Sequence, residues 1–128
     1  IDATAALNGT TPPPPPPPPP TSCPTGYTSY TGTVSSVGAS VYAPNTTGFT
    51  VTSGTALGGI LTGPTGTDFD LYLQRRTLNG SNWSNVVSAT STSSNETINA
   101  TGSASYRYRW RIYSYAGTGA FTFCGRPQ

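Results

Sequence analysis

The stretch Thr101–Phe123, TGSASYRYRWRIYSYAGTGAFTF, decides the fold of this chain. Its first half alternates strictly. A period of two places one set of side chains on each face of an extended strand. An apolar face carries Tyr106, Tyr108, Trp110 and Ile112, and the opposite face carries Arg107, Arg109, Arg111 and Tyr113. A Gly-rich turn follows, and the alternation then resumes through Phe123, so the stretch predicts a β-hairpin with an aromatic core face.

Outward from this hairpin, short runs of strand-forming residues are separated by turns rich in Gly, Pro and Asn. The clearest run is Asp68–Arg75, in which Phe69, Leu71 and Leu73 are expected to point inward and the polar residues between them outward. Short strands with frequent turns and no helical stretch predict an all-β fold, an antiparallel β-sandwich that is jelly-roll-like. The other expected strands are Tyr27–Val34, Ala39–Tyr42, Phe49–Thr52, Leu57–Leu61, Val86–Ala89 and Glu96–Ala100.

The chain divides into an N-terminal arm (residues 1–11), a polyproline linker (residues 12–21) and the β-sandwich domain (residues 22–128). The nine prolines of Pro12–Pro20 predict a stiff polyproline II rod of ~28 Å, which would hold the arm away from its own domain. As a strand, the arm would place four residues on one face, although its composition also suits a short helix. Those four candidate assembly residues are Ile1, Ala3, Ala5 and Leu7.

The charged residues argue against catalysis and against nucleic-acid binding. Charged residues make up only 8% of the chain, and there is no His, so a Ser-His-Asp or Cys-His site is absent. We interpret the arginine stripe of the hairpin as a solvated sheet face that pairs with Asp68 and Asp70 across neighbouring strands. These two carboxylates are also weak candidates for a calcium site, because hard cations favour oxygen ligands. The sequence thus predicts neither an enzyme nor a cofactor.

Exposed aromatic residues offer a possible binding surface. Trp83 lies in a polar turn, and Tyr113 and Tyr115 are expected on the outer face near the Gly-rich turn. A strip of exposed rings would stack on sugar rings or line a peptide groove. The alternative is that Trp83 folds back onto the sheet.

Cys23 and Cys124, the only cysteines, bracket most of the chain and predict a disulfide. A disulfide implies an oxidising, extracellular compartment. No apolar run is long enough to cross a bilayer, so membrane insertion is not expected. The missing initiator Met suggests a processed piece of a longer precursor. Candidate glycosylation sites occur as Asn-x-Ser/Thr sequons at Asn8, Asn45, Asn79, Asn82, Asn95 and Asn99.

Residues 25–123 resemble the bacterial pre-peptidase C-terminal domain family. The resemblance rests on Asp68, Asp70, Leu71 and Tyr72 in one strand, on Glu96 and Thr97, and on Tyr108, Arg111, Ile112, Tyr113 and Ser114 before a Gly turn. The first residues, IDATAAL, are similar to the end of the catalytic domain in subtilisin-like peptidases. This resemblance implies a non-catalytic C-terminal module of a secreted serine peptidase.

Two functions follow as expectations. The first is an extracellular structural module that self-assembles head-to-tail into a filament, with the arm of one copy added as a strand to the sandwich of the next. The second is an accessory module of a secreted peptidase that binds insoluble protein or polysaccharide. The expected partner is therefore another copy of the chain or such a polymer.

Overall fold

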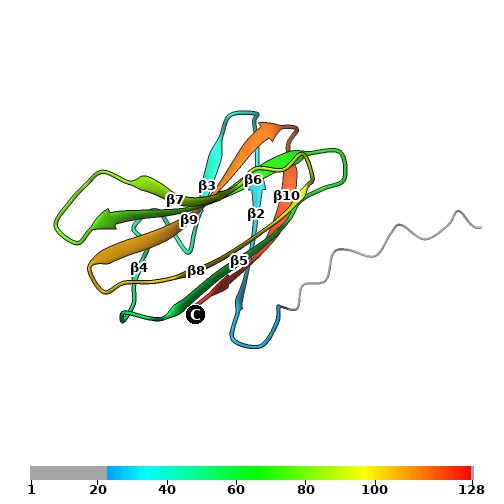
Figure 1. Ribbon diagram of the computed structural model, residues 1–128. Helices are drawn as coiled ribbons and strands as arrows, with labels where there is room; N and C mark the ends of the chain where they lie inside the picture. Colours follow the sequence, from blue (N-terminus) through cyan, green and yellow to red (C-terminus); the bar gives the residue numbers. More distant parts are fainter. Residues whose placement is uncertain (1–22, 128) are drawn as a thin grey trace, which may run out of the picture.

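The computed structural model describes residues 23–127 of the chain, and this part consists of strands and turns without a helix (Figure 1). The expected arm and the whole polyproline linker lie outside the described residues. The strands are β2 (Thr28–Val34), β3 (Ser40–Ala43), β4 (Phe49–Thr50), β5 (Ala56–Thr62), β6 (Asp68–Thr77), β7 (Ser84–Ala89), β8 (Asn95–Thr101), β9 (Tyr106–Ala116) and β10 (Gly119–Arg126).

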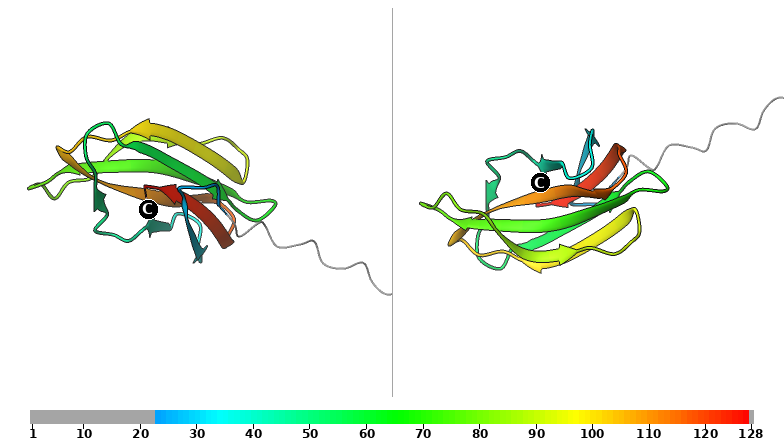
Figure 2. Two further views of the ribbon diagram at one scale, coloured as in Figure 1. Left: turned by 90° about the horizontal axis from the view of Figure 1, so that it is seen from below. Right: turned by 90° about the horizontal axis from the view of Figure 1, so that it is seen from above.

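The strands form two antiparallel sheets. One has the order β2-β10-β5-β8, and the other has the order β3-β9-β6-β7, with the short strand β4 also paired to β9. These two interleaved orders are those of a jelly roll, which confirms the all-β sandwich predicted from the sequence. The long strands β6 and β9 pair along their whole length and run side by side through the molecule (Figures 1 and 2).

The core lies between the two sheets and is built from the alternation seen in the sequence. Tyr108, Trp110 and Ile112 of β9 are buried, and so are Phe69, Leu71 and Leu73 of β6. Across the sandwich, the ring of Trp110 packs against that of Phe123 on β10, with 5.4 Å between centroids. Period-two patterning therefore placed the core residues of the two central strands correctly.

The glycines of β5 make room for this aromatic packing. A Cβ atom at Gly59 would lie 2.8 Å from the ring of Trp110 and 3.0 Å from that of Phe123. Gly59 therefore faces the core inside a continuous strand, Ala56–Thr62. The glycine pair, which breaks the apolar run in the sequence, leaves space for a large side chain from the opposite sheet.

The expected disulfide is present. Cys23 and Cys124 are bonded, with 5.6 Å between their Cα atoms, and Cys124 lies on β10, between β2 and β5. The bond ties the start of the described domain to its last strand. Within residues 23–127, no helix is long and apolar enough to cross a membrane.

Candidate functional site

The outer face of the β3-β9-β6-β7 sheet carries a layered stack of guanidinium groups and aromatic rings. The Arg109 guanidinium lies between two rings, with its carbon 4.0 Å from the ring centre of Tyr42 and 4.1 Å from that of Trp83. Arg76 lies 5.3 Å from the centre of the same indole ring. Further along the face, Arg111 lies against two more rings, those of Tyr72 and Tyr113. We call this set of residues the arginine–aromatic face.

Hydrogen bonds hold the guanidinium groups in place. Arg109 donates through Nε to Oε1 of Gln74, at 2.8 Å, and through Nη1 to the Thr46 carbonyl. Arg111 donates through Nε to the Ser40 hydroxyl, also at 2.8 Å. Arg107 donates to the carbonyl of Gly48. In the described part of the chain, these partners are neutral, so the side chains are oriented while their positive charge stays uncompensated.

The expected ion pairs between the arginine stripe and Asp68 and Asp70 are therefore wrong. Asp70 does not point into solvent as the alternation predicted, because its side chain is only 5% exposed. Gln74, also expected to point outward, is buried against Arg109. Stacked aromatic rings take the place of carboxylates as the neighbours of the guanidiniums.

The candidate binding aromatics do not form one exposed strip. Trp83 folds back over the sheet against Arg76 and Arg109, as the alternative interpretation proposed, so its indole ring is already in contact with guanidiniums. Tyr113 is half-buried against Arg111, whereas Tyr115 is 67% exposed. Tyr113 and Tyr115, together with Tyr72, line a surface pocket with a volume of about 420 Å³, which adjoins the Arg111 end of the face.

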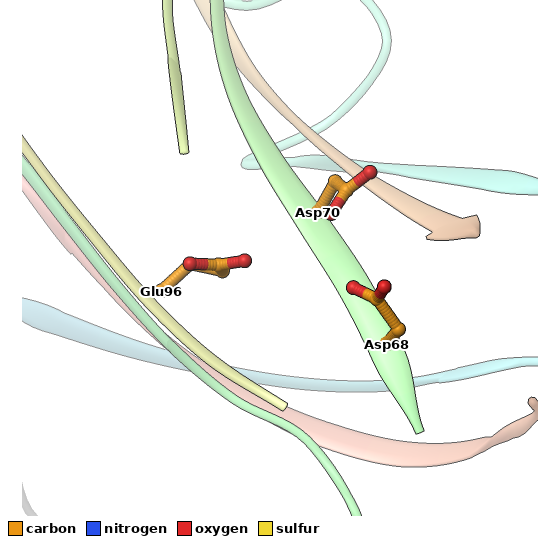
Figure 3. A group of neighbouring side chains, drawn as sticks. All are labelled: Asp68, Asp70 and Glu96. Carbon is orange, nitrogen blue, oxygen red and sulfur yellow. The ribbon is translucent and has the colours of Figure 1, made fainter. Parts of the chain in front are cut away.

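Two of the acidic residues of the domain, Asp68 and Asp70, line that pocket, and the third lies close to them. Asp68 and Asp70 lie on β6, and Glu96 reaches toward them from β8 in the opposite sheet (Figure 3). One carboxylate oxygen from each of the three residues lies within 4.8 Å of the others. Ser91, in the loop between β7 and β8, donates a 2.8 Å hydrogen bond to Oε1 of Glu96. We call Asp68, Asp70 and Glu96 the carboxylate triad.

Burial and nearby negative charge raise the pKa of two members of this triad, Asp70 and Glu96. The pKa of Asp70 is raised from 3.8 to about 6, first by burial, then by the charge of Asp68 and a hydrogen bond with it, and then by the charge of Glu96. Burial also raises the pKa of Glu96, partly offset by its hydrogen bonds from Ser91. Each of the three side chains has one buried carboxylate oxygen without a hydrogen-bond partner, namely Oδ1 of Asp68, Oδ1 of Asp70 and Oε2 of Glu96.

Sequence reasoning paired Asp68 with Asp70 but missed two contributors. The alternation of β8 could have identified Glu96, since it shares the inward face of this strand with the buried Ile98. A charged residue on a buried face is rare unless it is paired. Tyr42 carries no such signal, because its contact with Arg109 depends on the pairing of β3 with β9.

The sequons fall at accessible positions. Asn45, Asn79 and Asn82 are exposed in turns, and Asn95 and Asn99 are exposed on β8. These five positions therefore remain candidate glycosylation sites, and Asn8 lies outside the described residues together with the arm residues Ile1, Ala3, Ala5 and Leu7.

No family model matches the chain, and the resemblance to the pre-peptidase C-terminal domain stays a prediction. Among solved structures, the chain is similar to the crystal structure of a mitogen derived from Yersinia pseudotuberculosis, with a TM-score of 0.54. The two sequences are 17% identical, and the similarity covers 77% of this chain and 83% of that one. At this identity the likeness supports the β-rich fold and carries no inference about activity.

Proposed function

We propose that this chain is a non-catalytic, extracellular binding module and that its arginine–aromatic face takes an acidic polysaccharide. The observation that carries this proposal is the stack of oriented guanidiniums, which have no carboxylate partner among residues 23–127. Four of the six arginines lie on this face of the central strands β6 and β9: Arg76, Arg107, Arg109 and Arg111. Such a row has the charge and the planar donors that carboxylate and sulfate groups bind.

The stacking supports a charged polymer over a neutral one. The guanidiniums of Arg76 and Arg109 both lie against the Trp83 ring, so a neutral sugar would have to compete with them to stack there. Within residues 23–127, the Arg111 guanidinium donates a hydrogen bond only through Nε, so its terminal N–H groups remain for a ligand. The rings thus serve as supports that hold the donors flat.

The compartment also bears on the choice of polymer. The disulfide between Cys23 and Cys124 favours an oxidising environment, where acidic polysaccharides are the common extended polyanions and nucleic acids are rarer. An accessory role beside a secreted peptidase is compatible with this binding activity. Head-to-tail assembly through the arm stays a prediction, because Ile1–Leu7 lies outside the described residues.

Binding to polymers of matched size and different charge tests the proposal. We expect the full chain to bind heparin or polygalacturonate at low salt, with affinity that falls as salt rises, and to leave neutral dextran and cellulose unbound. Arg109→Ala and Arg111→Ala should each weaken binding about tenfold, on the scale of one charge-assisted contact. Arg126→Ala is the matched control, because Arg126 lies on β10 in the other sheet, where it stacks on Tyr27.

Three outcomes would contradict the proposal. One is no binding to either acidic polymer at low salt. Another is an equal loss of affinity for Arg126→Ala and Arg111→Ala. The third is tighter binding to single-stranded nucleic acid than to the acidic polysaccharides, which would assign the face to a different partner.

A further inference from the structure

The carboxylate triad joins the two sheets at one end of the sandwich. Asp68 and Asp70 come from β6, in the sheet β3-β9-β6-β7, and Glu96 comes from β8, the edge strand of the other sheet. Figure 3 shows the Glu96 carboxylate extended from β8 toward the two aspartates on β6. The three side chains therefore meet between the two sheets.

Buried carboxylates in this number must be protonated or must have a positive partner. Asp70 and Glu96 are each 5% exposed, and each has a buried oxygen without a hydrogen-bond partner. Leaving ionised groups in this state costs several kcal/mol per ion, which native folds avoid by pairing, protonation or metal binding. The nearby Arg109 and Arg111 donate their hydrogen bonds to neutral partners and not to these carboxylates. Among the described residues, protonation or a bound cation is therefore what can neutralise the buried carboxylates.

The spacing of the oxygens fits one shared ion. Calcium binds oxygen ligands at about 2.3–2.6 Å, so two ligands of one ion are at most about 5 Å apart. The triad oxygens meet this condition, since they lie within 4.8 Å of one another. The surface pocket beside them is lined by Thr90 and Thr92 of the loop between β7 and β8, which adds hydroxyl and carbonyl oxygens and leaves room for water.

We propose that Asp68, Asp70 and Glu96 form a calcium site that clamps β6 to β8 across the sandwich. The ligands are all oxygen, the chain has no His, and both cysteines are in the disulfide, which disfavours zinc. Calcium is preferred over magnesium because the ligands come from two strands and a loop, an irregular set that suits the flexible coordination of calcium. The site lies apart from the Arg109–Trp83 stack and does not depend on the polysaccharide proposal.

Calorimetry and thermal melting of the full, disulfide-bonded chain test this site. After treatment with EDTA, titration with calcium chloride should give one saturable site with a dissociation constant on the order of 10⁻⁴ M or lower. At a hundredfold excess over that constant, calcium should raise the melting temperature by about 10 °C. Magnesium chloride at the same concentration should give a clearly smaller shift.

Conservative variants make the test specific. Asp70→Asn and Glu96→Gln keep the shape of the side chain, should abolish the calcium response, and should melt no lower than the parent chain in EDTA because each removes a buried charge. Asn99→Gln, at an exposed position of the same strand β8, is the control and should keep the full response. Arg109→Ala should also keep it, because the rings that Arg109 contacts, Tyr42 and Trp83, do not line this pocket; this variant therefore separates the calcium site from the proposed polysaccharide face.

The calcium proposal would be overturned by a melting temperature that calcium leaves unchanged up to about 10 mM, which exceeds the dissociation constants of weak extracellular modules. It would equally be overturned if Asp70→Asn and Glu96→Gln bound calcium like the parent chain. A response to magnesium as large as that to calcium would refute the assignment of the ion.

Discussion

Asp70 gives this protein an unusual dependence of stability on pH. Without calcium, its pKa is about 6 in the folded chain and 3.8 in its ordinary state. Near pH 4 and below, the carboxyl is protonated in the fold at little cost. Between pH 4 and 6 the unfolded chain ionises while the folded chain stays protonated, so the free energy of unfolding falls as pH rises through this window and then levels off.

We therefore predict that, in EDTA, the melting temperature is higher at pH 5 than at pH 7.5, the reverse of ordinary acid destabilisation. The chain has only four acidic residues and no His, and three of the four acids form the triad, so few other groups titrate here. Asp70→Asn should flatten the profile. A melting temperature that falls between pH 7.5 and pH 5 in the parent chain would show that the triad is ionised at little cost.

At the residue scale, the sequence predicts burial where it follows from alternation within one strand. It misses burial and contacts that depend on residues of another strand. The buried Trp110 and Ile112 follow from the period of β9 alone. The burial of Asp70 does not, because it depends on neighbours outside β6, including Tyr113 of β9 and the loop before β8. The pairing of arginines with aspartates failed for the same reason, since Arg109 meets Tyr42 and Trp83 from elements distant in the sequence.

At the scale of the element, β5 shows how a strand adapts to the opposite sheet. Gly59→Ala would place a methyl group 2.8 Å from the Trp110 ring, closer than real contacts allow. We predict a loss of about 1–3 kcal/mol in the free energy of unfolding, because the added methyl overpacks the core. Urea unfolding followed by tryptophan fluorescence measures this loss.

The matched control for this strand is Thr97→Ala on β8, an exposed position in the neighbouring strand, which should change stability by less than about 0.5 kcal/mol. Equal stability of Gly59→Ala and the parent chain would mean that Trp110 repacks without cost. Element boundaries themselves were well predicted, since β5, β6 and β8 each extend only one or two residues beyond the expected runs. Gly and Pro turns are local signals, and they fix where strands end.

At the scale of the whole molecule, charge is divided along one sheet. The arginine–aromatic face occupies the part of β6 and β9 around Gln74 and Arg109, while the carboxylates of Asp68 and Asp70 lie at the start of β6. The order of strands in the jelly roll is what brings Glu96 to the same end, because β8 lies at the edge of its sheet and packs against β6 and β7. Composition could predict the fold class, but only this topology unites the triad.

The disulfide closes the described domain on itself, and its removal gives the last prediction. Cys23 and Cys124 are separated by 101 residues in the sequence, so the bond restricts nearly the whole unfolded chain. Loop-closure entropy then predicts that the double variant Cys23→Ser/Cys124→Ser loses about 4–5 kcal/mol in the free energy of unfolding. Because this approaches the full stability of a domain of this size, we expect the variant to be partly unfolded at 37 °C by circular dichroism. Calcium should restore part of that stability, since the triad ties β6 to β8 independently of the Cys23–Cys124 bond. A double variant as stable as the parent chain would mean that the disulfide adds nothing to the free energy of unfolding and that core packing alone stabilises the fold.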